Sequence, residues 1–430
     1  MAKKALVLGG GGAKGSYQMG AWRAFRELGM EFDIIVGTSI GAINGALMTQ
    51  DSFETADKLW STIEYENLFG EDRQSDVRSI NSVLDMVKFA VNDGLLEGRL
   101  DTSRLEQLVI ETIDEQKVRN AKNDFGLVAV ELPTMRPFVP MIADMPEGSL
   151  HGSIMASSAC FPVFSPYEMN GMRYIDGGYY DNLPINMAIE HGAEEIVAVD
   201  LDGVGFVKEP KNADGILITR INSYWDLGAV FDFDQNIFAR NRLLGYFDTL
   251  KAFGKLEGCY YTFSNGEQER NHAALANGIE LFEKSITNLL RRPIARTIKT
   301  VEKDTAIDFL SRADWSSDAP EMLCRVAEIC GVVYGISPEK EYSFSEFNAE
   351  LLRKYREQPQ AFSHEKIQRE DVKKLLSTAL QSLEPKRMSA SVTQLLQSSE
   401  RQEAVRVLAG ILPREYAAAC YIDLLLKNEK

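Results

Sequence analysis

One serine lies at a corner that few backbones can form. Ser39 is the centre of a Gly-x-Ser-x-Gly sequence that follows the apolar triplet at residues 34–36. The triplet predicts a short buried strand, and the small residues at 42–47 predict a helix packed close to a sheet. At such a strand-to-helix turn only glycine fits two positions before and two positions after the serine, and the hydroxyl points outward. Gly37 and Gly41 fill those positions, so the pattern predicts a nucleophile elbow; an inert serine in a glycine-rich turn is the alternative.

A second glycine-rich turn precedes the elbow. The apolar run at residues 5–8 ends in four consecutive glycines, and a helical pattern follows them. This order of strand, loop and helix exposes backbone amides at a helix N-terminus, where they suit an anion or a developing negative charge. Because open α/β sheets place their sites at the carboxyl ends of strands, we expect this loop to face Ser39. The amides of this glycine loop are therefore candidates for an oxyanion hole.

Two nucleotide-binding motifs compete for the same loop. A P-loop ends in Gly-Lys-Ser/Thr, and the order Lys-Gly-Ser at residues 14–16 does not match it. The glycines do satisfy the dinucleotide fingerprint, which also needs an acidic residue at the end of the next strand. Asp33 precedes that strand, and Gly37 and Ser39 occupy its end. Nucleotide binding is therefore the weaker interpretation of this loop.

An aspartate ends a later predicted strand. Residues 163–175 predict a hairpin with its turn at Asn170, and its second strand leads into Asp176. Gly177 and Gly178 follow, so the backbone can turn sharply beneath the projecting carboxylate. A plain Asp-Gly turn is the alternative.

The length of the chain predicts more than one domain. A single core stops growing near ~250 to 300 residues, so we expect 430 residues to form a large domain and a smaller one. The α/β pattern fades beyond Asp200, and helical patterns dominate the later part of the chain. A change in composition near residues 291–293 predicts a boundary between a catalytic domain at 1–290 and an all-helical C-terminal region at 291–430.

Charge and cysteine content restrict the partners and the setting. The formal net charge of -16 opposes nucleic acid and strongly anionic membranes at long range, and a neutral or zwitterionic substrate stays open. The five cysteines contain no Cys-x-x-Cys pair, so we predict neither a disulfide framework nor a zinc site. The N-terminal apolar run is too short for a signal peptide, and no stretch approaches the ~18 apolar residues of a membrane span. A cytoplasmic setting is the default expectation.

The three motifs together resemble a known family. Gly-Gly-Gly-x-Lys-Gly at residues 10–15, Gly-x-Ser-x-Gly at 37–41 and Asp-Gly-Gly at 176–178 are similar, in this order, to the patatin-like phospholipase family. The resemblance covers roughly residues 5–200. It implies a three-layer α/β/α core with a mainly parallel sheet, and a lipid acyl hydrolase that uses a Ser-Asp dyad without histidine.

The resemblance also assigns roles to individual residues. Ser39 would be the nucleophile and Asp176 the base, and Lys14 holds the family's basic position. The oxyanion hole would be lined by Gly10, Gly11 and Gly12, and elbow geometry adds the amide of Ile40 as a helper. The supporting motif glycines are Gly15, Gly37, Gly41, Gly177 and Gly178.

Elementary chemistry leads to the same roles. A serine hydroxyl is a poor nucleophile until a base removes its proton, and an aspartate within hydrogen-bond reach can act as that base. Attack on an ester carbonyl makes a tetrahedral oxyanion and then an acyl-enzyme, which water must cleave. We expect no cofactor and no metal, because no His-Glu-x-x-His motif or His/Cys cluster is present.

Several alternatives stay open. An acyltransferase would share the dyad, and a non-catalytic lipid-binding protein would share the fold. A Ser-His-Asp triad would draw on one of four histidines, of which His151 is the best placed; the others are His191, His272 and His364. The partner is expected to be a lipid or another acyl ester, with its identity and the oligomeric state of the protein open.

Two segments raise the question of lipid contact. The apolar loop at residues 93–96 is either ordinary packing or part of an acyl-chain entrance. The basic cluster at residues 291–299 is either a solvated helix face or a transient contact with the headgroups of a membrane surface.

Overall fold

The computed structural model describes residues 2–69, 80, 82, 85, 88, 100–290, 319–359, 384–397 and 408–429. The chain forms two compact units, Met1–Phe253 and Gly254–Lys430. The boundary predicted from composition lies further along, at residues 290/291. The loop at 93–96 and the basic cluster at 291–299 lie outside the described residues.

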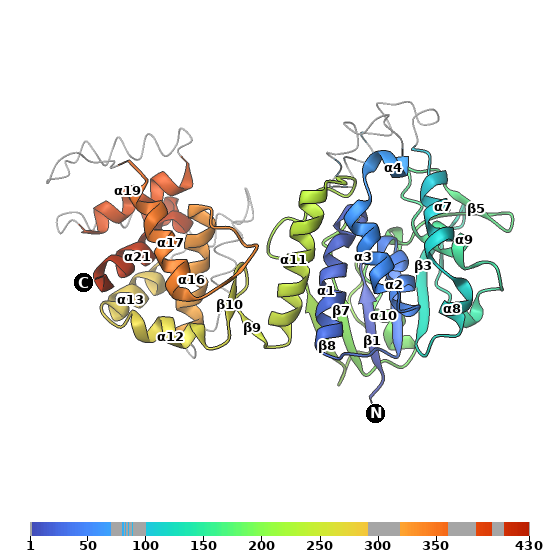
Figure 1. The fold of residues 1–430 in the computed structure, drawn as a ribbon, viewed down its shortest axis with the longest axis horizontal. Coiled ribbons are helices and arrows are strands. Elements are labelled where there is room, and N and C mark those ends of the chain that lie inside the picture. Colours follow the sequence, from blue (N-terminus) through green and yellow to red (C-terminus); the bar gives the residue numbers. More distant parts are fainter. Residues whose placement is uncertain are drawn as a thin grey trace. The chain divides into compact units, whose positions relative to one another are not determined.

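An eight-stranded sheet forms the centre of the first unit (Figure 1). Its order is β5-β6-β3-β2-β1-β7-β8, with β4 paired to β3. The strands β1, β2, β3, β7 and β8 are parallel to one another, whereas β4, β5 and β6 are antiparallel to their neighbours. Their bounds are β1 Lys4–Leu8, β2 Ile34–Thr38, β3 Asp124–Leu132, β4 Arg136–Phe138, β5 Tyr167–Met169, β6 Met172–Asp176, β7 Glu195–Val199 and β8 Leu217–Ile221.

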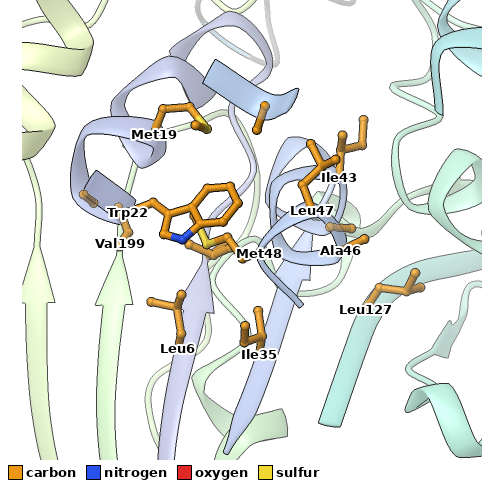
Figure 2. Close-up of a cluster of buried hydrophobic side chains, with 14 of the residues drawn as sticks. Leu6, Met19, Trp22, Ile35, Ile43, Ala46, Leu47, Met48, Leu127 and Val199 are labelled. Carbon is orange, nitrogen blue, oxygen red and sulfur yellow. The ribbon is translucent and has the colours of Figure 1, made fainter. Parts of the chain in front are cut away.

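Helices cover both faces of this sheet, which explains why its central strands are apolar throughout. On one face, α1 (Ser16–Glu27), α2 (Ile40–Thr49) and α11 (Gln235–Ala252) pack over the strands. Figure 2 shows Leu6, Ile35 and Leu127 of three strands facing Trp22 and Met48 of the helices. On the other face, α10 (Ile185–Glu190) packs against the alternate strand residues. The expected three-layer α/β/α fold with a mainly parallel sheet is confirmed.

Shorter helices complete the first unit. They are α3 Phe53–Thr62, α4 Tyr65–Phe69, α7 Ser103–Thr112, α8 Glu115–Arg119 and α9 Leu150–Ser157, with 3-10 turns η1 Gly12–Gly15, η2 Ile142–Asp144 and η3 Gly177–Tyr179.

The strand β3 joins the parallel and antiparallel parts of the sheet. Its first half pairs in parallel with β2, ending at Thr38 opposite Val128. Its second half pairs antiparallel with β6, beginning at Ala129 opposite Asp176. The end of β2 and the end of β6 are therefore held at the same level on the two sides of one strand.

The second unit is mainly helical. Its helices are α12 Glu267–Ala274, α13 Ile279–Leu290, α16 Ala319–Tyr334, α17 Phe344–Arg356, α19 Pro385–Gln397 and α21 Pro413–Asn428. A small sheet, β9 Leu256–Glu257, β10 Thr262–Ser264 and β11 Glu341–Tyr342, adds three short strands. The described part of the region after residue 290 is thus helical as expected, except for β11. Among the helices that the structure describes, none is both long and apolar enough to cross a membrane.

Candidate active site

Ser39 occupies a strained turn between β2 and α2. Its φ of 55° and ψ of -123° lie in a region that L residues rarely adopt, and such strain typically marks functional sites. The glycines on either side allow the turn, because a Cβ on Gly37 would lie 2.2 Å from the Gly41 carbonyl oxygen and a Cβ on Gly41 would lie 2.2 Å from that of Leu8. The predicted elbow geometry is therefore present.

Hydrogen bonds from neighbouring elements hold this turn. The Ser39 amide donates to the Ser157 hydroxyl oxygen at 3.0 Å, and the Ser157 hydroxyl donates to the Val128 carbonyl at 2.6 Å. The Thr38 hydroxyl donates to the Asp181 carbonyl at 2.8 Å. The backbone of the turn is thus fixed, while the Ser39 side chain faces a cavity.

Strand register brings Asp176 to Ser39. Thr38 lies opposite Val128 on one side of β3, and Asp176 lies opposite the next residue of β3 on the other side. A Cβ on Gly177 would lie 2.1 Å from the Val128 carbonyl oxygen and 2.9 Å from Thr38, so only glycine lets η3 pass this close. Ser39 and Asp176 line the same cavity, and the Ser39 side chain is near enough to the carboxyl group of Asp176 to lower its pKa.

The environment of Asp176 makes it a stronger base than an ordinary carboxylate. The residue is 7% exposed. Burial raises its pKa to about 6, although the neighbouring Ser39 side chain and a hydrogen bond from the Gly178 amide act in the lowering direction. The Gly178 bond is 2.8 Å long. A carboxylate with this pKa is still ionised near neutral pH and holds a proton more readily than a solvated one.

The glycine loop offers two free backbone donors. Within the described ranges, the amides of Gly11 and Gly12 have no hydrogen-bond partner, and both residues line the cavity. The amide of Ile40, at the first turn of α2, is likewise unpartnered in the described chain. These three amides, with the positive end of the α2 dipole, are suited to a developing oxyanion.

Gly10 does not share this arrangement. Its amide donates to the Asn182 carbonyl at 3.0 Å, and its carbonyl accepts from the Asn182 side chain at 3.2 Å. Gly10 is therefore not a free donor in this geometry, and its predicted role as an oxyanion ligand is corrected to that of a structural link between the glycine loop and the aspartate turn.

Lys14 does not line the cavity that contains Ser39 and Asp176. Its ammonium group donates to the Asp202 carbonyl at 3.1 Å. Gly15 packs against α2, because a Cβ there would lie 2.4 Å from the Ile40 side chain.

A buried amide network under the glycine loop was not predicted from the sequence. Gln18 donates to the Gly9 carbonyl at 2.8 Å and accepts from Asn44 at 2.8 Å. Asn44 also donates to the Gly15 carbonyl at 3.1 Å and accepts from the Trp60 indole at 3.1 Å. The network ties both ends of the glycine loop to α2 and to the cavity wall. The two amide side chains, Gln18 and Asn44, are fully buried in the structure. Because buried polar groups need hydrogen-bond partners, amides at positions expected to be buried in the two helices were the available signal of such a network.

Ser39 and Asp176 line an apolar cavity of about 190 Å³. Its walls come from α3, α4, α7 and the segment at residues 230–233, none of which was predicted as a site. The apolar lining side chains are Ile40, Ile43, Leu59, Trp60, Ile63, Leu68, Phe69, Leu105, Leu108, Val109, Phe164, Val204, Phe206, Val230, Phe231 and Phe233. Such a lining suits a hydrocarbon chain.

Competing nucleophiles and bases are not favoured by the geometry. Cys160 lines the cavity, but burial and the nearby Asp176 raise the pKa of its thiol, which keeps it protonated. His151 is held by the Ile113 carbonyl at 2.7 Å and His191 by the Met187 carbonyl at 2.8 Å. No histidine among the described residues lines the cavity, and His364 lies outside them. Across the described part of the chain, no three His, Cys, Asp or Glu side chains gather as metal ligands.

A strained serine between a strand and a helix of an α/β sheet defines the class of proteins that carry a nucleophile elbow. The family model described as patatin-like phospholipase matches residues 6–189 of the chain.

The chain spans about an eighth of the length of the curated relatives described next. The chain is 25% identical over 262 residues to lysophospholipase NTE1 of Mycosarcoma maydis, which covers 60% of this chain and 13% of that protein. It is 30% identical over 204 residues to patatin-like phospholipase domain-containing protein 7 of Rattus norvegicus, covering 46% of this chain and 13% of the relative. Among solved structures, VipD from Legionella pneumophila aligns with a TM-score of 0.36 and 13% identity, over 99% of this chain and 90% of that one.

Proposed function

We propose that this protein is a serine esterase of the phospholipase A type, which hydrolyses acyl esters of lipids through a Ser39-Asp176 dyad and an acyl-enzyme. The observation that carries the proposal is that the strained Ser39 and the buried Asp176 line the same apolar cavity, at the adjacent ends of β2 and β6. The match of residues 6–189 to the patatin-like phospholipase model supports the same reaction class, as do the names of the relatives, a lysophospholipase and a patatin-like phospholipase domain-containing protein.

The proposed first half-reaction forms the acyl-enzyme. The Ser39 oxygen attacks the ester carbonyl carbon while its proton passes to Asp176, a step for which general-base help is worth ~10² to 10⁴ in rate. The amides of Gly11, Gly12 and Ile40 receive the oxyanion, and the loss of one such donor typically costs ~2.7 to 4 kcal/mol. The tetrahedral intermediate collapses, and the leaving alcohol takes the proton from Asp176.

The second half-reaction uses the same groups in reverse. A water molecule gives its proton to Asp176 and attacks the acyl-enzyme, and the Ser39 oxygen recovers that proton as the fatty acid leaves. In this scheme the apolar cavity holds the acyl chain beside the dyad.

The test is hydrolysis of a fluorogenic acyl ester by the full chain. We expect Ser39→Ala and Asp176→Asn each to lower kcat/KM by at least about 10³-fold, because the two groups act as one unit. A fluorophosphonate probe should label the parent on Ser39 and leave Ser39→Ala unlabelled. Replacement of all four histidines is the control, and we expect it to leave most of the activity. An active Asp176→Asn variant would require a different base.

Product analysis separates the alternatives. With a lysophospholipid present as an acyl acceptor, a hydrolase releases free fatty acid, whereas an acyltransferase forms a diacyl product. Lipid binding without turnover or probe labelling would favour the non-catalytic alternative.

A further inference from the structure

The loop at residues 203–207 presents two apolar side chains to solvent beside the cavity. Phe206 is 65% exposed and Val207 is 44% exposed. Phe206 is at the same time one of the residues that line the cavity. A large side chain that is both exposed and part of the lining stands at an opening of the cavity, and exposed apolar groups at such a place indicate an interaction surface.

The catalytic loops hold this loop in place. The Phe206 amide donates to the Gly178 carbonyl at 2.8 Å, and its carbonyl accepts from the Asn182 amide at 2.6 Å. A Cβ on Gly203 would lie 2.0 Å from the Gly10 carbonyl oxygen, so the loop packs directly on the glycine loop. The position of Phe206 is therefore coupled to the turns that carry the dyad and the free amides.

The charges around the loop favour an electrically neutral surface as its partner. The segment at residues 202–211 has two acidic side chains, the exposed Asp202 and Glu209, and two basic ones, Lys208 and Lys211. Its formal charge is therefore zero. The whole chain carries a formal net charge of -16, which opposes an anionic bilayer at long range. An aromatic and an aliphatic side chain on a locally neutral rim match the interfacial layer of a zwitterionic membrane.

We propose, resting on the lipid hydrolase function proposed above, that Phe206 and Val207 insert into the surface of a zwitterionic lipid layer and hold the mouth of the cavity against it. An acyl chain then passes from the layer into the cavity without crossing water. Burial of the two exposed side chains in the lipid supplies the binding free energy.

The first test measures binding without catalysis. Ser39→Ala protein is sedimented with phosphatidylcholine vesicles, and the substitutions Phe206→Ser and Val207→Ser are added together. We expect the partition coefficient onto vesicles to fall at least about tenfold, in line with the apolar area withdrawn from the lipid. The matched control is Leu217→Ser, since Leu217 is 63% exposed at the start of β8 and is not part of the cavity lining; it should bind as the parent does.

A second measurement reports insertion directly. In the Phe206→Trp variant, we expect vesicles to shift tryptophan emission to shorter wavelength relative to the same experiment with the parent. Val207→Glu should lower hydrolysis of vesicle phosphatidylcholine while a water-soluble short-chain ester is still hydrolysed at the parent rate, because Val207 lies outside the lining.

Three results would overturn the inference: unchanged binding of the Phe206→Ser/Val207→Ser protein, an equal loss with Leu217→Ser, or binding of the parent to anionic vesicles alone. The proposed function and the proposed lipid-contact surface can be contradicted independently of each other. Vesicle binding that depends on Phe206 without any ester turnover contradicts the function and supports the surface, whereas turnover of soluble ester without Phe206-dependent binding does the reverse.

Discussion

At the scale of single residues, the proposed mechanism makes the carboxyl group of Asp176 the base, and so makes the reaction depend on pH. A base works only in its ionised form, and burial raises the pKa of Asp176 to about 6. We therefore expect kcat/KM to fall as the pH drops through about 6 and to level off above it. The measurement is a profile with a water-soluble ester from about pH 4 to about pH 8. A flat profile across this range would mean that another group removes the proton from Ser39.

The same buried carboxyl group makes the folded protein less stable at neutral pH. Its pKa is about 6 in the fold and ~3.9 in an unfolded chain, so folding favours the protonated form of this group. The resulting contribution to the free energy of unfolding is fully present below pH ~3.9 and is lost as the pH rises through about 6. Asp176→Asn removes the ionised form. We expect it to raise the free energy of unfolding at pH 7 by ~1 to 3 kcal/mol and to change it little at acidic pH.

Urea unfolding at the two pH values tests this expectation. Ser39→Ala is the control for loss of activity alone, because it leaves the carboxyl group in place. An Asp176→Asn protein that is no more stable than the parent at neutral pH would show that the folded protein compensates the ionised carboxylate in another way.

At the scale of elements, two glycines of α2 differ in how much space surrounds them: Gly41 belongs to the elbow, and Gly45 lies further along the helix. A Cβ on Gly41 would lie 2.2 Å from the Leu8 carbonyl oxygen, whereas the nearest atom to a Cβ on Gly45 would be 3.2 Å away, in the Phe125 side chain. Alanine is favoured over glycine by ~1 kcal/mol within a helix. We expect Gly41→Ala to destabilise the fold by ~2 kcal/mol or more and Gly45→Ala to change it by less than ~1 kcal/mol. Thermal unfolding of the pair checks this, and equal effects would contradict it.

Elements with local signals were predictable from the sequence. The hairpin turn is confirmed, since Asn170 and Gly171 have φ angles of 53° and 76°. An Asn-Gly pair favours a type I′ turn, which requires positive φ at both residues. The strands that end in the glycine loop and at Ser39 also follow from short apolar runs bounded by glycine.

Features that depend on distant pairing were not predictable. The partner of Gly10 is 172 residues away in the chain, so no local pattern indicates that its amide is occupied. The cavity is lined by α3, α7 and residues 230–233, whose apolar residues are indistinguishable from ordinary core residues in the sequence. The Phe206 side chain gives no signal either, because its exposure depends on how the loop packs on Gly10 and Gly178.

At the scale of the whole molecule, all parts of the candidate site belong to the first unit. The cavity lining runs from Gly11 to Phe233, and this unit ends at Phe253. We expect a fragment of residues 1–253 to fold and to hydrolyse a water-soluble ester at a rate within about tenfold of the full chain. Circular dichroism and fluorophosphonate labelling of Ser39 are the measurements. A folded fragment that neither reacts with the probe nor turns over ester would assign a catalytic role to the second unit.

The position of β3 between β2 and β6 has a consequence for how such a chain can vary. The separation of Ser39 and Asp176, the proposed nucleophile and base, is set by three adjacent strands and not by the many residues between them in the sequence. Insertions and deletions in the connections before Asp124 and after Leu132 can therefore reshape the substrate pocket while the two reacting groups keep their spacing. Loss or gain of a single residue within β3 itself would shift Ser39 relative to Asp176, and we expect it to abolish the proposed reaction although neither side chain is changed.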